Sequence, residues 1–265
     1  MNELPKVIHY CWFGEKQLSN EEYNCIQSWK RFCPDYEIKE WNETNFDINC
    51  CDYAKEAYQA KKWAFVSDYA RFVILQRYGG VYFDTDVEVL KPIEELTSEG
   101  PFMGWEENEG INEGPFVAPG LGMAAYPNMP FISRIIDYYN GQHYINKDGL
   151  VNKETVVTIN TKLLIEDGLQ CDKSFQKIDD FCIYPPEVLC PMNKASGKIN
   201  ITGKTLTIHK YSMSWFNPYE KRIVQIMRKY AEKGKSGTIR ENAALLPWKV
   251  KNKLFKKLHQ SNNMD

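Results

Sequence analysis

The hydrophobic and polar positions at the start of the chain predict a β-α-β unit. Ser19 and Glu22 form a capping box, apolar residues then recur at helical spacing, and Pro34 ends the helix. Short apolar runs at residues 7–10 and 36–41 flank this helix and predict two strands. A β-α-β opening favours a mostly parallel sheet with helices on its faces.

A longer helix is predicted over residues 63–78, because its apolar pattern continues until two glycines end it. Residues 81–83 then predict a short buried strand, with Asp84 and Asp86 directly after it. In α/β sheets, ligands gather outside the carboxyl ends of strands. We therefore expect the two carboxylates to lie at the edge of the core and to face a cleft.

Later segments continue the series of strands and helices. Strands are predicted at 102–106, 120–126, 183–186 and 206–209, helices at 131–139 and 158–166, and an exposed loop at 108–114. After Pro218 the pattern is helical and basic throughout. We expect residues 1–218 to form one α/β domain and residues 219–265 a helical C-terminal extension.

Composition places the chain among ordinary globular proteins, since 43% of its residues are hydrophobic and 26% are charged. No apolar run approaches the roughly 20 residues of a membrane-spanning helix. The N-terminus also lacks the pattern of a secretory signal, so we expect a cytoplasmic location. The 8 cysteines include no C-x-x-C pair, which favours free thiols over a disulfide framework or a zinc site.

Charge changes the picture at the C-terminus. Residues 220–265 carry a balance of +8, whereas the remainder of the chain carries −10. The stretch PWKVKNKLFKKLHQ places Trp248 and Phe255 among five lysines, which is typical of an amphipathic helix on an anionic membrane surface. A basic helix packed on the acidic body is the alternative. Nucleic acid is not expected as a partner, because no recognised binding motif accompanies the charge.

The pair Asp84 and Asp86 has the spacing of a cation site. Carboxylates two residues apart at a strand end can converge on one ion, and Mg²⁺ or Mn²⁺ accepts such ligands together with substrate phosphates. Asp68 and Arg71 share one face of the preceding helix. There the carboxylate can accept hydrogen bonds from sugar hydroxyls, and the guanidinium can hold a phosphate. The alternatives are two solvated acids in a turn and an ion pair within the helix.

Four segments follow a pattern in common with a known family. They are FVSDYARFVILQRYGGVYFDTDV, LPKVIHYCWFG, CPDYEIKEWNE and IHKYSMSW. The first resembles S-D-x-x-R followed by Y-G-G-x-Y-x-D-x-D of glycosyltransferase family 32, and the others resemble its opening, its second strand and its closing element. The likeness spans about residues 4–216. The family includes yeast-type mannosyltransferases and bacterial capsule and exopolysaccharide enzymes, with the clostridial glucosylating toxins as more distant relatives.

The resemblance implies a GT-A fold, which is a single Rossmann-like α/β domain that binds a nucleotide sugar across a mixed central sheet. It implies Mn²⁺ or Mg²⁺ as the cofactor, with Asp84, Asp86 and His209 as metal ligands. Asp84 would also contact the ribose or the donor sugar, and Asp68 and Arg71 would hold the sugar. These two residues and the two aspartates of the pair would carry the catalysis. A surface histidine is the alternative for His209.

Further donor-binding residues follow from the resemblance. His9, Tyr10 and Trp12 come at and after the first strand, where the base of the nucleotide would bind, and Trp12 would stack on it. Ser214 and Trp215 would close over the diphosphate as a lid and exclude water. The alternatives are a structural role for His9 and a place in the core for Trp12.

The reaction implied is transfer of a hexose or N-acetylhexosamine to a saccharide acceptor with retention of the anomeric configuration. A UDP-sugar donor is favoured over GDP-mannose, because capsule-type enzymes are the more similar members. The acceptor would be lipid-linked, in capsular or exopolysaccharide synthesis at the inner face of the cell membrane. Two other classes stay open. A nucleotidyltransferase acting on sugar phosphates would need a glycine-rich loop, which HYCWFGEKQLSN lacks. A non-catalytic carbohydrate-binding protein would not need this whole set of charged residues.

Overall fold

The opening β-α-β unit forms as predicted in this computed structural model, which describes residues 3–107, 114–152, 154–212 and 218–232. Strand β1 (Val7–Cys11) leads to helix α1 (Asn20–Phe32) and strand β2 (Glu37–Trp41). The capping box at the start of α1 is present in both directions. β1 pairs in parallel with β2 and with β3 (Gly80–Tyr82), so it lies inside the sheet.

The central sheet has seven strands in the order β2-β1-β3-β6-β5-β8-β7. Its other members are β5 (Phe102–Gly104), β6 (Met123–Ala125), β7 (Gln176–Ile178) and β8 (Phe181–Tyr184). The β5–β8 pair is parallel, whereas β6 runs antiparallel to both of its neighbours and β7 to β8. The α/β class with a mixed central sheet is therefore confirmed, and the expectation of a mostly parallel sheet was too strong.

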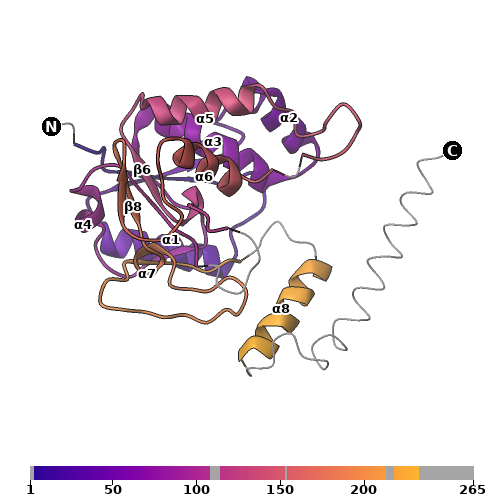
Figure 1. Cartoon of the computed structure of the whole chain (residues 1–265). Helices are drawn as coiled ribbons and strands as arrows, with labels where there is room; N and C mark the ends of the chain where they lie inside the picture. The colour runs from indigo at the N-terminus through magenta and orange to yellow at the C-terminus, as the bar shows by residue number, and fades with distance from the viewer. Residues whose placement is uncertain (1–2, 108–113, 153, 213–217, 233–265) are drawn as a thin grey trace.

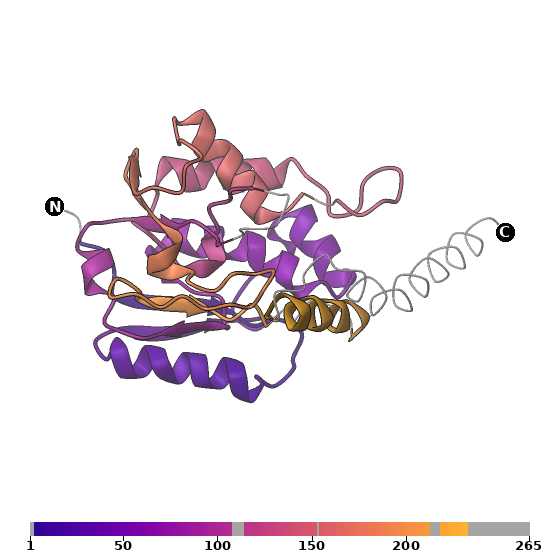
Figure 2. The ribbon, with the colours of Figure 1, turned by 60° about the horizontal axis from the view of Figure 1, so that its bottom comes forward.

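Helices cover both faces of this sheet (Figures 1 and 2). One face carries α2 (Asp52–Gln59), α3 (Trp63–Tyr78), α5 (Pro130–Asn140) and α6 (Val156–Glu166), which share one buried apolar cluster. Helix α1 lies on the opposite face and contributes Ile26 and Trp29 to a second cluster. Short helices α4 (Glu94–Thr97) and α7 (Pro186–Leu189) and the 3₁₀ turns η1 (Ile48–Cys50) and η2 (Pro119–Leu121) join these elements.

A second sheet has two strands, and the first of them directly follows Asp86. Strand β4 (Val87–Val89) pairs antiparallel with β9 (Thr207–His209), and Val87 stands opposite His209. The Trp29 indole of α1 donates a hydrogen bond of 2.7 Å to the Val87 carbonyl and ties the pair to the body. This pairing brings the end of β9 beside the residues that directly precede β4.

Some boundaries differ from the prediction for local reasons. The predicted strand at 183–186 begins earlier, at Phe181, and ends at Tyr184, because Pro185 and Pro186 cannot donate to a strand ladder and instead lead into α7. The first part of the strand predicted at 120–126 is the η2 turn. All eight cysteines are free, as predicted.

Helix α8 (Pro218–Glu232) begins where the helical extension was predicted. The rest of the basic tail, from residue 233 onward, lies outside the described residues, and so does most of the predicted loop at 108–114. Among the helices that are described, none combines the length and the apolar character needed to cross a membrane.

Candidate active site

Arg71 stands at the centre of the charged cluster on α3. Its side chain is buried, with 3% of the residue exposed. Nη2 contacts Asp68 Oδ1 at 2.8 Å and Asp84 Oδ1 at 3.2 Å, and Nε donates to the Ser67 carbonyl at 3.2 Å. The ion pair within the helix therefore exists, but the same guanidinium also joins α3 to the acidic pair. This bridge gives Arg71 a fixed position at the edge of the sheet.

The two carboxylates on Arg71 have opposite protonation tendencies. Burial raises the pKa of Asp68 to about 7, even though the Arg71 charge acts to lower it, while the charge of Asp84 adds to the rise. Burial also opposes ionisation of Asp84, but Arg71 and His209 outweigh it and lower the pKa of that carboxyl. Asp84 is thus the anion at neutral pH, whereas Asp68 can gain or lose a proton there.

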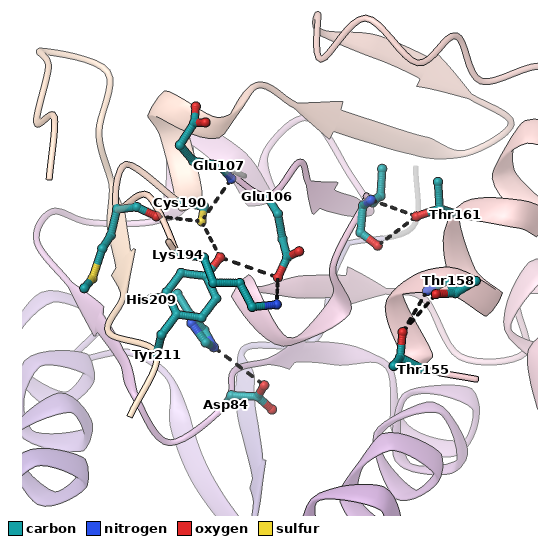
Figure 3. Close-up of polar contacts among 12 residues, drawn as sticks. Asp84, Glu106, Glu107, Thr155, Thr158, Thr161, Cys190, Lys194, His209 and Tyr211 are labelled. Atoms are coloured by element: carbon teal, nitrogen blue, oxygen red, sulfur yellow. Dashed lines mark hydrogen bonds and ion pairs between the residues drawn. The ribbon is translucent and has the colours of Figure 1, made fainter. Parts of the chain in front are cut away.

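Asp84, Asp86 and His209 form the candidate cation site. One ligand atom from each lies within 4.8 Å of the others. His209 Nε2 is 3.2 Å from Asp86 Oδ1 and 3.8 Å from Asp84 Oδ2, and Figure 3 shows the imidazole turned toward Asp84. In each carboxylate the other oxygen is already used, by Arg71 in one case and by the Ser212 backbone N–H in the other.

This set of atoms fits a hard divalent cation. Two carboxylate oxygens and one imidazole nitrogen converge, and Mn²⁺ and Mg²⁺ accept such donors. Burial would lower the pKa of His209, yet the carboxylates of Asp86 and Asp84 outweigh burial and raise it. His209 Nδ1 is buried and has no hydrogen-bond partner among the described residues. The expected ligand set is therefore brought together in space, and the alternative of a surface histidine does not hold.

Gly120 lies against the acidic pair and was missed from the sequence. A Cβ at this position would lie 2.0 Å from Asp84 Oδ2 and 3.2 Å from Arg71 Nη1. Asp84 N–H also donates to the Gly120 carbonyl at 3.2 Å. Only a residue without a side chain fits here, because the η2 turn packs its backbone directly on the carboxylate. A Gly-x-Gly stretch was visible in the sequence, but its neighbour in space was not.

The residues expected at the nucleotide base are in different environments. His9 is buried and both of its ring nitrogens are engaged by Gly79 and Trp41, so neither is available to a nucleotide. Tyr10 is 6% exposed and its hydroxyl donates to Glu40 at 2.6 Å.

Trp12 differs from these two because it is only partly buried. Its indole N–H donates to the Lys16 carbonyl at 2.5 Å, which holds the ring in place just beyond β1. Trp12 therefore packs against the second apolar cluster with part of its side chain exposed, which leaves both the stacking role and the place in the core open. Ser214 and Trp215, the expected lid, lie outside the described residues.

Comparison with known families matches a stretch in the first half of the chain. Residues 19–103 match a family model described as a glycosyltransferase sugar-binding region containing a DXD motif. Inositol phosphoceramide mannosyltransferase 1 of Schizosaccharomyces pombe is 29% identical over 114 residues, which cover 39% of this chain and 34% of the yeast enzyme. The matched stretch thus spans about a third of that relative's length.

Two solved glycosyltransferase structures are similar to this chain at a low level. The PaToxG glycosyltransferase has 18% identity and a TM-score of 0.42 over 62% of this chain and 70% of its own. A glycosyltransferase involved in glycosylation of the major capsid of PBCV-1 has 12% identity and a TM-score of 0.43 over 85% of this chain and 100% of its own. Likeness at this level does not bear on substrate or mechanism.

Proposed function

Because this chain carries the DXD-containing sugar-binding region of glycosyltransferases, we propose that it is a metal-dependent enzyme that transfers a sugar from a nucleotide donor. The observation that carries the proposal is the convergence of Asp84, Asp86 and His209 on one point, beside the buried Arg71. A non-catalytic binding protein for carbohydrates would not need Asp68 and Arg71 joined to this acidic pair.

The roles of the side chains follow from their positions. Arg71 has a planar fork that can contact the diphosphate or the sugar while it holds Asp84. Asp68 can accept a hydrogen bond from a sugar hydroxyl when ionised or donate one when protonated, since its pKa is near 7. A bound cation would neutralise the negative charge that develops on the leaving diphosphate. Gly120 leaves room for the Asp84 carboxylate beside Arg71.

We propose a UDP-hexose or UDP-N-acetylhexosamine as the donor, a saccharide as the acceptor and retention of the anomeric configuration. The support is the resemblance of the α3 and D-x-D segments to family 32 enzymes of the capsule type. A mannosyl donor is the main rival, since the curated relative is a mannosyltransferase. A thermal-shift panel of UDP, GDP and their sugars, with and without Mn²⁺, separates the two, because the true donor stabilises the folded state by mass action.

The test of the function is release of UDP from a UDP-sugar in the presence of Mn²⁺ with wild type and Asp86→Ala. We expect wild type to release UDP and the variant to keep less than about a tenth of that rate, because loss of a ligand costs several kcal/mol. Asp180→Ala removes an exposed carboxylate and serves as the matched control. Release of pyrophosphate from UTP and a sugar phosphate would instead indicate a nucleotidyltransferase. Sugar binding without any turnover would indicate a carbohydrate-binding protein.

We also propose that the basic tail holds the enzyme at the anionic inner face of the cell membrane, where a lipid-linked acceptor would be presented. The support is the +8 balance of residues 220–265. Each basic residue near such a surface contributes about 1 kcal/mol. Deletion of residues 244–265 should abolish sedimentation with anionic liposomes and leave UDP release intact. If full-length protein does not sediment at low salt, the tail is better explained as a helix that packs on the acidic body.

A further inference from the structure

Tyr211 packs directly on the candidate cation site. Its ring centroid lies 4.3 Å from that of the His209 imidazole, with the two planes at 67°. Tyr211 is 7% exposed, and Figure 3 shows its ring beside His209, on the side away from Asp84. An edge-to-face contact of this kind restricts the plane in which the imidazole can lie.

The Tyr211 hydroxyl contacts two further side chains. It lies 3.1 Å from Cys190 Sγ and 3.5 Å from Glu106 Oε1 (Figure 3). Glu106 is itself buried, with 4% exposed, and Lys194 Nζ is 3.5 Å from the same oxygen. Three segments that are distant in sequence therefore meet on one phenol. The buried Glu106 carboxylate thus has both the Tyr211 hydroxyl and Lys194 as partners.

The backbone at Tyr211 is in the left-handed region, with φ of 51°. This conformation is unfavourable for a residue with a side chain, so the surroundings must hold it. It lets the chain turn around Asp86. The Lys210 N–H donates to the Asp86 carbonyl at 2.9 Å, and the Ser212 N–H donates to Asp86 Oδ2 at 2.8 Å. Oδ1 of the same carboxylate then faces His209.

We propose that Tyr211 is a positioning residue that aligns the His209 imidazole and the Asp86 carboxylate for a divalent cation. The inference rests on the proposed metal site. Tyr211 acts in two ways: its ring sets the plane of the imidazole, and its left-handed backbone directs the Ser212 N–H to one oxygen of Asp86. Cys190 and Glu106 fix the ring through its hydroxyl. Partners of this kind around metal ligands typically change metal affinity by about 10- to 100-fold when they are removed.

The experiment is Mn²⁺ titration of the full chain, followed by electron paramagnetic resonance, which measures affinity without any turnover. We expect Tyr211→Leu, which removes the ring, to raise the Kd for Mn²⁺ by about tenfold or more. Tyr211→Phe keeps the ring and loses the anchor, so we expect a smaller rise, about threefold. Tyr36→Phe is the matched control, because it removes a buried tyrosine hydroxyl that contacts Thr97; it should leave the Kd unchanged.

A second measurement keeps the proposal testable if Tyr211→Leu fails to fold. Glu106→Gln keeps the shape of the anchor but changes its charge, and its Kd for Mn²⁺ should rise in the same direction as that of Tyr211→Phe. The nitrogen resonances of the His209 ring in metal-free protein should also shift in Tyr211→Phe, while those of His9 stay in place.

The outcomes separate the positioning role from the function on which it rests. The positioning role is overturned if wild type binds Mn²⁺ and the folded variants bind it with a Kd within twofold of the wild-type value; these variants are Tyr211→Phe, Tyr211→Leu and Glu106→Gln. That result leaves the enzyme proposal intact. Wild type that binds no Mn²⁺ overturns the cation site, and the positioning role with it.

Discussion

Two buried histidines in this protein have opposite environments. His9 is 1% exposed and His209 is 9% exposed, so burial alone hardly distinguishes them. Burial lowers the pKa of His9 to about 4, whereas the carboxylates of Asp86 and Asp84 outweigh burial and raise the pKa of His209. The partners of a buried histidine therefore decide its chemistry.

His9 is satisfied as a neutral ring. Its Nε2 lies 3.0 Å from the Gly79 carbonyl, to which it donates, and its Nδ1 accepts from the Trp41 indole N–H at 3.1 Å. If Nδ1 were protonated, its N–H would face the Trp41 indole N–H, and two donors would meet without an acceptor. In His209, by contrast, Nε2 faces two carboxylate oxygens and Nδ1 has no partner among the described residues. The ring nitrogens of His9 are therefore both occupied within the protein, whereas the carboxylate oxygens around Nε2 of His209 favour a bound cation.

The largest effect is expected from His209→Ala. Loss of one of three cation ligands should raise the activation free energy by about 4 kcal/mol, which corresponds to about a thousandfold fall in turnover. UDP release from a UDP-sugar measures it, and Mn²⁺ affinity should fall in parallel. His9→Phe is the matched comparison, since it should lose stability and keep its affinity for Mn²⁺. If His209→Ala retains more than a tenth of the activity, the distinction between the two histidines fails.

The next effect concerns acid stability and His9. Because its folded-state pKa is about 4 and the unfolded value is 6.5, its contribution is present above pH 6.5 and is lost as the pH falls through 4. The difference corresponds to about 3 kcal/mol. The free energy of unfolding of wild type, minus that of His9→Phe, should therefore decline by about this amount from pH 7 to pH 4 in denaturant titrations. A difference that does not change with pH would show that the His9 ring stays accessible to protons.

The sequence predicted the part of the site that is local. Asp68, Arg71, Asp84 and Asp86 lie on one helix and the strand end that follows it, so periodicity and glycine positions place them together. His209 was reached only through resemblance, because the β4–β9 pairing joins segments that are distant in sequence.

What stayed hidden from the sequence depends on close approach in space. Gly120 is required by a carboxylate that comes from another element, and the left-handed turn at Tyr211 is stabilised by contacts with Asp86. Neither has a local signal. The roles assigned to His9 and Trp12 differ for the same reason, since His9 lies within β1 and Trp12 directly follows it, and only the fold decides which ring is enclosed.

A smaller effect is expected from Arg71→Lys. The substitution keeps the charge but loses the planar guanidinium, whose Nη2 contacts Asp68 and Asp84 while its Nε donates to the Ser67 carbonyl. We expect turnover to fall about 30-fold, or about 2 kcal/mol, while UDP affinity changes little, because the role proposed for the guanidinium is contact with the sugar or the diphosphate rather than the base. Arg77→Lys on the exposed face of the same helix is the control. Loss of UDP affinity with turnover at saturation preserved would assign Arg71 to the nucleotide instead.

The smallest effect is expected where the nucleotide base would bind. Here Trp12 and Tyr10 can be compared in the same way as the two histidines. Stacking of a base on an aromatic side chain contributes about 1–3 kcal/mol. Trp12→Ala should therefore weaken UDP binding about tenfold in isothermal titration. Tyr10→Phe removes a hydroxyl that is engaged by Glu40 inside the core, so UDP affinity should stay within about twofold while stability falls by about 1 kcal/mol. The reverse result, with UDP binding lost in Tyr10→Phe and kept in Trp12→Ala, would mean that the nucleotide approaches β1 from its buried side. Partial exposure would then no longer indicate which aromatic residue binds the donor.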